Sequence, residues 1–382
     1  MKYYIIAGEA SGDLHGASLI KEFKAIDSHA QFRGWGGDNM QQEGMDLVKH
    51  YKGHAFMGFF EVVSHLRPIL KNLSLCKQDI ISYNPDAVIL IDYPGFNLEI
   101  AKFSRKNQLK VFYYISPKVW AWKSSRVKTI KKNVDKMFVI LPFETTFYEQ
   151  YQYSVEYVGN PVVDKIEAEK SKGVEREIFI NKNNLPDKPI IAILPGSRIH
   201  EVQKCLPHMI EACNDFNQYQ LVIAGVSTIN ASYYQHYVHL PNVSMVTDQT
   251  YQLLQLADAA IVTSGTAALE TALFNVPQVV CYKISLPTYI IGRMLVKIRF
   301  FTLVNLIMGR EVIKEILQFN LTDEIKKEMH KILFDKEYVK TMKNNYHHLK
   351  EKLGGKGASQ RVAKKIVYDL TVHKPEKCTE KR

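Results

Sequence analysis

The feature that most constrains the fold of this chain is a repeated alternation of short apolar runs with longer helix-forming segments. In the first half, the runs that we interpret as strands cover residues 3–7, 32–37, 86–92, 110–116, 136–142 and 155–161. In the second half, the corresponding runs cover residues 189–194, 220–224, 243–246, 259–262 and 276–282. Strands that alternate with helices pair in parallel and are covered by helices on both faces. The pattern therefore predicts an α/β protein with doubly wound sheets.

Two such sheets are expected, because 382 residues are too many for one ordinary core. We assign residues 1–163 to an N-terminal Rossmann-like domain and residues 184–353 to a C-terminal one. The two would be joined by a linker over 164–183, because the charged stretch Asp164–Glu177 has almost no apolar periodicity. Residues 354–382 would form a C-terminal helix and tail.

The C-terminal quarter of the chain reads as mostly helical. Residues 311–319 and 323–334 have the apolar spacing of amphipathic helices. The glycines within 354–357 follow a helix rather than a strand, so we interpret them as a helix stop and not as a phosphate loop. Residues 358–372 are predicted to form the last helix, and a frayed charged tail follows.

The net charge indicates which kinds of partner the protein can bind, and the cysteine content indicates the cellular compartment in which it works. A formal net charge of +11 favours anionic partners, namely nucleic acid, anionic lipid or a phosphorylated substrate. The five cysteines are scattered, with no Cys-x-x-Cys pair, which favours a reducing cytosol over a disulfide framework or a zinc site. No stretch resembles a signal peptide or reaches the ~18 apolar residues of a spanning helix. We expect a protein that does not cross a membrane but can bind its surface.

The first predicted strand leads into a glycine-rich turn, G-E-A-S-G-D-L-H-G, at Gly8–Gly16. Its spacing is that of neither a dinucleotide fingerprint nor a P-loop. One interpretation is a turn whose glycines let the next helix pack on the sheet. The other is a ligand-facing turn, which the polar side chains of Ser11, Asp13 and His15 favour.

The strand at 86–92 ends in D-Y-P-G-F-N, Asp92–Asn97. In open parallel sheets, ligands bind beyond the carboxyl ends of the strands, which is where Asp92 falls. A carboxylate at this place, beside a proline–glycine turn and Asn97, suits a general base. The alternative is that Asp92 only caps the following helix.

Two turns in the second half suit a phosphate. Gly196, Ser197 and Arg198 follow a strand and open a helix, so that backbone N–H groups and a guanidinium can hold a diphosphate. Gly265 and Thr266 open another helix in the same way, and Glu270 lies one turn further, within reach of sugar hydroxyls. The alternative is that these residues only make turns and cap helices.

Two segments are apolar, with cations among or beside the apolar residues. The first contains Phe56, Met57, Phe59 and Phe60, and the second contains Arg293, Met294, Lys297 and Arg299. Each can be core, or each can lie on a lipid interface with its cations on headgroups. The loop 117–122 joins two tryptophans to nearby cations, which is typical of nucleic-acid or headgroup binding.

No pattern of histidine, cysteine or carboxylate residues has metal-ligand spacing, and no G-x-S-x-G elbow of a serine hydrolase is present. The remaining features are two phosphate-suited turns in the second half and a strand-end acid in the first. They suggest a donor nucleotide held by one domain and an acceptor activated by the other, across a cleft.

Taken in order, the motifs resemble those of the lipid-A-disaccharide synthase family nearly from end to end. They are G-E-x-S-G-D-x-x-G at Gly8, D-x-P-x-F-N at Asp92, P-x-V-W-A-W at Pro117, L-P-G-S-R at Leu194, S-G-T-A-x-L-E at Ser264 and V-N-L-x-x-G-R-E at Val304. The resemblance implies a GT-B glycosyltransferase with no cofactor or metal requirement, whose last helix crosses back to the first domain. The implied reaction joins UDP-2,3-diacylglucosamine to 2,3-diacylglucosamine 1-phosphate, giving a β-1,6-linked disaccharide 1-phosphate and UDP.

The resemblance also implies roles for residues. Asp92 would be the base, and Asn305, Arg310 and Glu311 would complete the donor pocket. The residues on the acceptor side would be Ser11, Asp13, His15 and Asn97. The chain would be a monomer or homodimer on the cytoplasmic face of an anionic inner membrane, and it would not bind nucleic acid. Two competing functions are a UDP-sugar epimerase, which shares the fold but needs no lipid-facing surface, and a non-catalytic binder of anionic lipid or nucleic acid.

Overall fold

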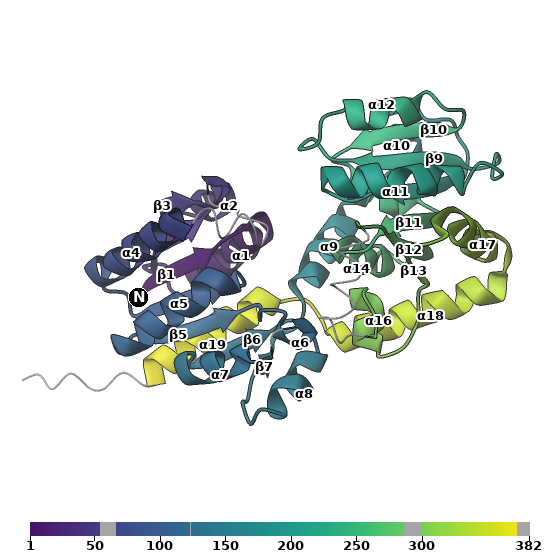
Figure 1. The fold of residues 1–382 in the computed structure, drawn as a ribbon. Coiled ribbons are helices and arrows are strands. Elements are labelled where there is room, and N and C mark those ends of the chain that lie inside the picture. The colour runs from purple at the N-terminus through teal and green to yellow at the C-terminus, as the bar shows by residue number, and fades with distance from the viewer. Residues whose placement is uncertain (54–65, 123, 286–298, 373–382) are drawn as a thin grey trace, which may run out of the picture. The chain divides into compact units, whose positions relative to one another are not determined.

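The structure is a computed structural model that describes residues 1–53, 66–122, 124–285 and 299–372. The chain divides into two compact units, one of residues 1–161 with the segment from Lys356 onward, the other of residues 162–355. Each unit holds one parallel sheet with helices packed on it (Figure 1). The prediction of two Rossmann-like α/β domains is therefore confirmed.

The described residues of the first unit form a seven-stranded parallel sheet in the order β3-β2-β1-β4-β5-β6-β7. Its strands are β1 (Lys2–Ala7), β2 (Gln31–Gly36), β3 (Asp46–His50), β4 (Ala87–Ile91), β5 (Lys110–Tyr114), β6 (Lys136–Val139) and β7 (Glu156–Tyr157). Its helices are α1 (Ala10–Ile26), α2 (Asp38–Gln42), α4 (Leu66–Tyr83), α5 (Pro94–Lys106), α6 (Val119–Trp122), α7 (Arg126–Asn133), α8 (Phe143–Glu149) and α19 (Ala358–Val372), with a 3-10 turn at Tyr51–Gly53.

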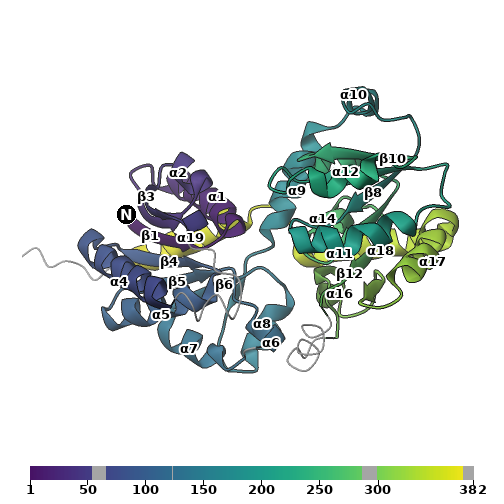
Figure 2. The same ribbon diagram turned by 45° about the horizontal axis from the view of Figure 1, so that its top comes forward.

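Alternate residues of each strand enter different cores, because successive side chains of a strand point to opposite faces. Tyr3 and Ile5 pack with residues of α1 and α19 on one face of the sheet. Tyr4 and Ile6 pack with residues of α4, α5 and α7 on the other (Figure 2). The sheet is thus buried on both sides, which explains why β1 and β4 read as continuous apolar runs.

The last helix, α19, belongs to the first unit although it lies at the other end of the sequence (Figure 1). Val362, Ala363 and Ile366 are fully buried in the same core as α1. The Arg361 guanidinium donates a hydrogen bond to the carbonyl of Val158 (2.8 Å), and Lys136 pairs with Asp369 (2.8 Å). The first unit is therefore made from two separate pieces of chain.

The described residues of the second unit form a six-stranded parallel sheet in the order β10-β9-β8-β11-β12-β13. Its strands are β8 (Ile190–Leu194), β9 (Gln220–Gly225), β10 (Val243–Thr247), β11 (Ala259–Thr263), β12 (Gln278–Tyr282) and β13 (Glu315–Leu317). Its helices are α9 (Pro161–Lys172), α10 (Arg176–Lys182), α11 (Ile199–Glu211), α12 (Ser232–Val238), α13 (Thr250–Leu256), α14 (Thr266–Leu273), α16 (Leu303–Met308), α17 (Leu321–Phe334) and α18 (Lys336–Leu353). Helix α11 packs against α12 and α17, whereas α14 packs against α16 and α18.

The structure differs from the sequence-based expectation in several segments, two of which lie in the second unit. Residues 164–183 are not an irregular linker, because α9 and α10 occupy most of them and pack within the second unit. Residues 311–319 are not a helix, because Glu315–Leu317 pair with β12 as the edge strand β13. Hydrogen bonds from Phe301, Thr302 and Asn305 hold the Glu315 carboxylate, and this tertiary contact overrides the helical spacing.

The described part of the chain lacks a membrane-spanning helix and a metal-binding cluster. No helix there has the length and hydropathy needed to span a membrane. No group of three or more histidine, cysteine or acidic side chains in that part is arranged to hold a metal ion. The four described cysteines (Cys76, Cys205, Cys213 and Cys281) are buried free thiols.

Candidate active site

The strand order brings two loops together at the carboxyl edge of the first sheet. β1 lies between β2 and β4, so the chain leaves β1 toward one side of the sheet and leaves β4 toward the other. Such a reversal is where open α/β sheets bind ligands. Glu9 follows β1 and Asp92 follows β4, so both carboxylates stand at this point.

Asp92 has an unusual backbone conformation at the end of β4. Its φ is 43° and that of Tyr93 is 48°, both in the left-handed region that few residues other than glycine adopt. The main-chain carbonyl of Asp92 accepts hydrogen bonds from the Asn97 side-chain amide (2.8 Å) and the Tyr113 hydroxyl (2.5 Å). These two bonds hold the turn through the main chain and do not engage the carboxylate.

The pKa of the Asp92 carboxyl is raised to about 6, chiefly because it is buried and next because the Glu9 carboxylate is near. The positive charge of Lys118 and the N–H of Tyr93 act in the opposite direction. A carboxylate with a pKa just below neutrality is ionised at physiological pH, yet is basic enough to accept a proton. Asp92 therefore has the place and the basicity that a general base needs.

Asn97 was expected on the acceptor side, and in the structure its side chain bonds to the main chain. It is fully buried, and its side-chain amide donates hydrogen bonds to the carbonyls of Ile91 (3.2 Å) and Asp92. Its observed contacts are thus with the backbone at the end of β4. We therefore assign Asn97 the role of positioning Asp92.

The glycine-rich segment Gly8–Gly16 is not mainly a turn, because α1 begins at Ala10, and the first residue of the segment, Gly8, lies against Tyr93 beside Asp92. A side chain at Gly8 would place its Cβ 2.2 Å from the Tyr93 ring, so glycine is required for this close approach. Ser11 is exposed, and its hydroxyl donates to the Glu9 carboxylate (2.5 Å). His15 is half-buried on the same helix.

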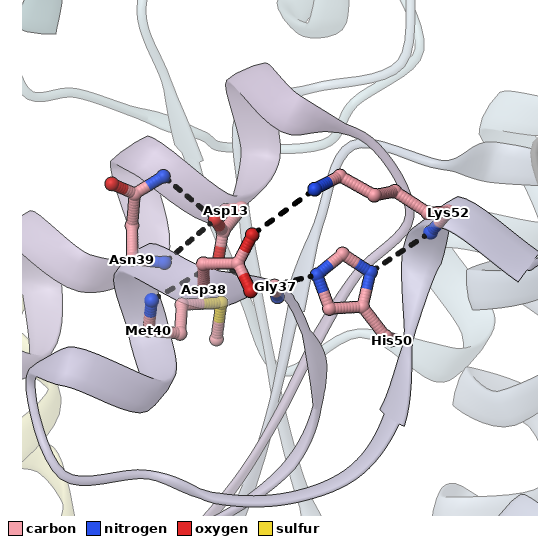
Figure 3. A network of polar contacts seen from close by, with 7 residues as sticks. All are labelled: Asp13, Gly37, Asp38, Asn39, Met40, His50 and Lys52. Carbon is pink, nitrogen blue, oxygen red and sulfur yellow. Dashed lines mark hydrogen bonds and ion pairs between the residues drawn. The ribbon is translucent and has the colours of Figure 1, made fainter.

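Asp13, the third expected acceptor-side residue of this segment, is buried and faces the start of α2 (Figure 3). One carboxylate oxygen accepts the N–H groups of Gly37 (2.8 Å) and Met40 (3.0 Å). The other accepts the main-chain N–H of Asn39 (3.1 Å) and its side-chain amide (2.8 Å). Four donors occupy the carboxylate, because the unpaired N–H groups at the start of α2 need an acceptor. Asp13 therefore holds the loop after β2.

The second sheet repeats the reversal between β8 and β11, which are neighbours in the strand order. The turn of Gly196, Ser197 and Arg198 follows β8, and the turn of Gly265 and Thr266 follows β11. The two turns predicted to hold phosphate therefore stand at the reversal point of one sheet. This is the position at which phosphate groups meet helix N-termini in doubly wound folds.

The first of these turns already holds a carboxylate from its own helix. Glu201 accepts the N–H groups of Ser197 (3.1 Å) and Arg198 (3.3 Å), and it also pairs with the Arg198 guanidinium (3.5 Å). Gly196 has φ +104°, and a Cβ there would lie 2.3 Å from the Glu201 carboxylate. These two N–H groups, which we expected to hold phosphate, thus hold Glu201 in the structure. The positive end of the helix dipole attracts either anion.

The second turn offers a helix start without a capping side chain. Gly265 is the N-cap of α14 and has no side chain that could accept the N–H groups opening the helix. The first turn of α14 contains no acidic residue, and Gly265 and Thr266 are exposed. Apart from the neighbouring chain, no atom of the described residues lies within 4 Å of the position that a Cβ on Gly265 would take. This helix start can therefore receive a phosphate.

Glu270, on the same helix, is half-buried, and its carboxylate accepts a hydrogen bond from the Tyr251 hydroxyl (2.7 Å). Arg310 and Glu311 are exposed after the left-handed Gly309. Arg310 donates to the Asn345 side chain (2.7 Å), and Glu311 lies 3.5 Å from Lys314.

Asn305, also expected in the donor pocket, is fully buried beneath these residues. Its side-chain oxygen accepts the N–H groups of Val312 (2.7 Å) and Ile313 (3.1 Å). Its side-chain nitrogen donates to the Ile313 carbonyl (2.9 Å) and the Glu315 carboxylate (2.9 Å). All four hydrogen-bonding positions of the amide are occupied within the protein. We therefore assign Asn305 a positioning role for the segment that carries Arg310 and Glu311.

Most of the residues expected to contact acyl chains or membrane lie outside the described residues. This applies to Phe56, Met57, Phe59 and Phe60, and to Arg293, Met294 and Lys297. Arg299 is described. It is exposed, and its guanidinium lies 5.1 Å from the centre of the Phe300 ring.

Three further residues act at the candidate sites and were not predicted to do so, namely Glu9, Lys118 and Tyr251. Beside the effect of burial, Glu9 raises and Lys118 lowers the pKa of Asp92, and Tyr251 donates a hydrogen bond to Glu270. Glu9 follows directly on β1, at the end of the sheet where ligands bind, and this position is a usable signal in the sequence. Lys118 and Tyr251 act through contacts between distant parts of the chain, which no local pattern indicates.

Two Rossmann-like units with reversal points at their carboxyl edges define the fold of GT-B glycosyltransferases and related UDP-sugar enzymes. A UDP-GlcNAc 2-epimerase from Neisseria meningitidis, solved with UDP-GlcNAc, matches with a TM-score of 0.69 at 12% identity, covering 96% of this chain and all of the other. The calicheamicin glycosyltransferase matches with a TM-score of 0.60 at 13% identity, over 98% and 99% of the two chains. At these identities the likeness shows the fold alone.

Sequence comparison identifies the family. The family model described as lipid-A-disaccharide synthetase matches residues 3–367. The lipid-A-disaccharide synthase of Syntrophus aciditrophicus is 40% identical over 98% of both chains, and that of Geobacter sulfurreducens is 36% identical over 94% of both. Lipid-A-disaccharide synthase 1 of Legionella pneumophila is 36% identical over 98% of this chain and 97% of its own. The chain belongs to the lipid-A-disaccharide synthase family, as its motifs indicated.

Proposed function

We propose that this chain condenses UDP-2,3-diacylglucosamine with 2,3-diacylglucosamine 1-phosphate in lipid A biosynthesis. The products are a β-1,6-linked disaccharide 1-phosphate and UDP. Membership of the family supports the reaction. The observation that carries the proposal is the buried Asp92 carboxylate, with a pKa of about 6, at the reversal point of the first sheet.

In the proposed mechanism, Asp92 accepts the proton of the acceptor's 6-hydroxyl. The hydroxyl oxygen then bonds to the anomeric carbon of the donor while the bond from that carbon to the diphosphate oxygen breaks, and the configuration inverts. A general base contributes about 10²–10⁴-fold to such a step. Ser11 and His15 would stand on the acceptor side, and Asp13 and Asn97 would position the loops around it.

The donor would be held by the second unit. The start of α14 at Gly265 and Thr266 offers main-chain N–H groups and a positive dipole end, and Arg198 adds a cation. Together they would stabilise the charge that develops on the leaving diphosphate. Glu270 would bind the ribose hydroxyls, and Arg310 and Glu311 would complete the pocket. Gly196 and Ser197 would shape the turn that carries Arg198, because the Ser197 N–H already holds the Glu201 carboxylate.

The base is tested with the substitution Asp92→Asn. Purified protein is mixed with both acylated substrates, and disaccharide and UDP are measured by mass spectrometry. We expect turnover to fall at least about 100-fold, the contribution of a general base, while UDP still binds. Asp187→Asn, an exposed aspartate of the second unit, is the matched control. Near-normal turnover by the Asp92 variant would remove it from the role.

The donor pocket is tested by the affinity for UDP, measured by calorimetry. Arg198→Ala should weaken UDP binding about tenfold or more, because a charge-assisted hydrogen bond is lost. Arg176→Ala, an arginine elsewhere in the same unit, serves as the control. Unchanged affinity for the Arg198 variant would show that the nucleotide binds elsewhere.

The alternative function is that of a UDP-sugar epimerase, because UDP-GlcNAc 2-epimerases share this fold. The same preparations decide between the two functions. An epimerase converts UDP-GlcNAc without any lipid acceptor, whereas a synthase releases UDP only when both acylated substrates are present. Conversion of UDP-GlcNAc alone would overturn the proposed reaction.

We also propose that the protein works in the cytoplasm on the surface of an anionic inner membrane. The support is the net charge of +11 together with the acylated, phosphorylated substrates of the proposed reaction. Replacing Arg293, Lys297 and Arg299 together by glutamine should weaken co-sedimentation with anionic vesicles. Unchanged binding by that triple variant would exclude these residues from the membrane-binding surface.

A further inference from the structure

Tyr251, on α13, forms a hydrogen bond with a carboxylate of the proposed nucleotide site. Its hydroxyl donates to one oxygen of Glu270 on α14 at 2.7 Å, and both side chains are half-buried. The two residues are 19 positions apart in the sequence and come from helices that flank β11 along the chain. The bond therefore depends on the tertiary fold and is not a local cap.

The Tyr251 ring is held on more than one side. It packs against the Phe274 ring with centroids 5.5 Å apart, and the Lys165 ammonium lies 4.7 Å from its centre. Burial, and next the negative charge of Glu270, raise the pKa of the Tyr251 hydroxyl far above its usual value. The hydroxyl therefore keeps its proton and remains a hydrogen-bond donor at every pH at which the protein works.

Helix α9, which carries Lys165, is itself fixed to the helices that carry Tyr251 and Glu270. The Lys170 ammonium donates to the carbonyl of Leu273 at the end of α14 (2.6 Å). The Gln255 side chain of α13 donates to the carbonyl of Glu169 (3.4 Å). Tyr251 thus lies where α9, α13 and α14 are bonded to one another. These contacts hold its hydroxyl in the position from which it donates to Glu270.

We propose that Tyr251 is a positioning residue for nucleotide binding, which holds one oxygen of Glu270 so that the carboxylate can accept hydrogen bonds from the ribose hydroxyls. This inference rests on the proposed function, in which Glu270 binds the ribose. A glutamate side chain has three rotatable bonds, and one fixed oxygen removes most of its freedom before the nucleotide arrives. Such preorganisation strengthens binding, because less conformational entropy is lost when the complex forms.

The test measures how strongly the full chain prefers UDP over 2′,3′-dideoxy-UDP, as a ratio of dissociation constants from calorimetry. Tyr251→Phe removes the hydroxyl and keeps the ring with its packing. We expect this variant to bind UDP about tenfold more weakly, the effect of one lost hydrogen bond to a charged group. Its affinity for the dideoxy nucleotide should be unchanged, so the preference falls by the same factor. Tyr233→Phe, an exposed tyrosine of α12, is the control and should retain the preference.

Glu270→Gln separates failure of this inference from failure of the proposed function. If Glu270→Gln loses the preference and Tyr251→Phe keeps it, Glu270 binds ribose without help from Tyr251 and the inference is overturned. Equal weakening of both nucleotides by Tyr251→Phe would also overturn it, because the effect would then not involve the ribose. If Glu270→Gln keeps the preference, the ribose role of Glu270 and the inference both fall.

Discussion

Three acidic side chains near the two reversal points have different roles. The role of each follows from the hydrogen-bond donors around it. Asp13 receives four N–H donors and Glu201 receives two main-chain N–H groups, so both are fixed as internal acceptors. Asp92 is buried, with Glu9 close by, and its pKa is raised to about 6. Burial opposes ionisation of a carboxyl, which is why this pKa is raised. Asp92 is therefore suited to exchange a proton near neutral pH.

The raised pKa of Asp92 predicts a pH dependence. Asp92 must be ionised to act as a base, so kcat/KM should fall as the pH drops below about 6. Lys118→Gln removes a charge that lowers this pKa, so the fall should begin at a higher pH. Glu9→Gln removes a charge that raises it, so the fall should begin at a lower pH. The measurement is a set of pH–rate profiles.

Lys128→Gln, an exposed lysine of α7, is the control for those profiles. Because it changes the net charge as Lys118→Gln does, it corrects for any general effect of charge on substrate binding. A Lys118 variant whose profile coincides with that of the Lys128 variant would contradict the electrostatic account of the Asp92 pKa.

The four bonds of Asp13 predict a large effect on stability. In the Asp13→Asn variant, an NH₂ group replaces one carboxylate oxygen and faces N–H donors. Those buried donors then lose their acceptor. We expect the free energy of unfolding to fall by on the order of 3 kcal/mol, measured by urea denaturation. Asp38→Asn is the matched comparison from the same network (Figure 3). It should have a much smaller effect, because Asp38 is 61% exposed and solvent screens its ion pairs.

At the scale of elements, the two phosphate-suited turns are built differently. The turn after β8 needs glycine, because Gly196 has φ +104° and Glu201 fills the space beside it. The turn after β11 does not need glycine for its backbone, because Gly265 is extended (φ 169°) and faces open space. The fold therefore excludes a side chain at Gly196 but leaves room for one at Gly265.

This difference predicts opposite results for two alanine substitutions. Gly196→Ala should lower the free energy of unfolding by about 2–4 kcal/mol, because of strain and overpacking. Gly265→Ala should lower it by less than about 1 kcal/mol, the usual difference between these residues at an N-cap. It should nevertheless weaken UDP binding, because the methyl group occupies space that the diphosphate needs. Urea denaturation and calorimetry give the two readouts, and unchanged UDP affinity for Gly265→Ala would exclude the start of α14 as the phosphate site.

At the scale of the whole molecule, the two units differ in how the chain builds them. The second is one continuous segment, whereas the first needs α19 to complete a core that starts with β1. Residues of α19 such as Val362 and Ile366 are fully buried against that core. A fragment that ends before α19 would leave this apolar surface in water.

We therefore predict that residues 1–161 expressed alone do not fold cooperatively. The same fragment with residues 356–372 joined to it through a flexible linker should show a cooperative thermal transition by circular dichroism. A linked fragment carrying Ile366→Ala should be less stable than the linked parent by about 2–5 kcal/mol, while the exposed Tyr368→Ala should have little effect. Cooperative unfolding of residues 1–161 alone would show that α19 is dispensable.

The doubly wound class, most of the strands and the candidate base could all be predicted from the amino-acid sequence. Runs such as 87–91 and 190–194 are buried on both faces, so continuous apolar character identified them without any knowledge of their partners. Asp92 could be singled out because the end of such a strand is always the ligand-binding edge of an open sheet. The edge strands β3 and β13 were not predicted, because both mix polar with apolar residues and are only partly buried.

The hydrogen-bond partner of each polar side chain near the sites, by contrast, follows from the tertiary fold and could not be predicted. Asp13, Asn97 and Asn305 read as ligand-binding residues in the sequence, yet the structure uses them to hold loops. The pKa of Asp92 depends on its burial and then on Glu9 and Lys118, and the Glu270 carboxylate accepts a hydrogen bond from Tyr251. The physical reason is that hydrogen bonds and charges act through space at distances of a few ångströms, between segments whose proximity arises only when the sheets assemble.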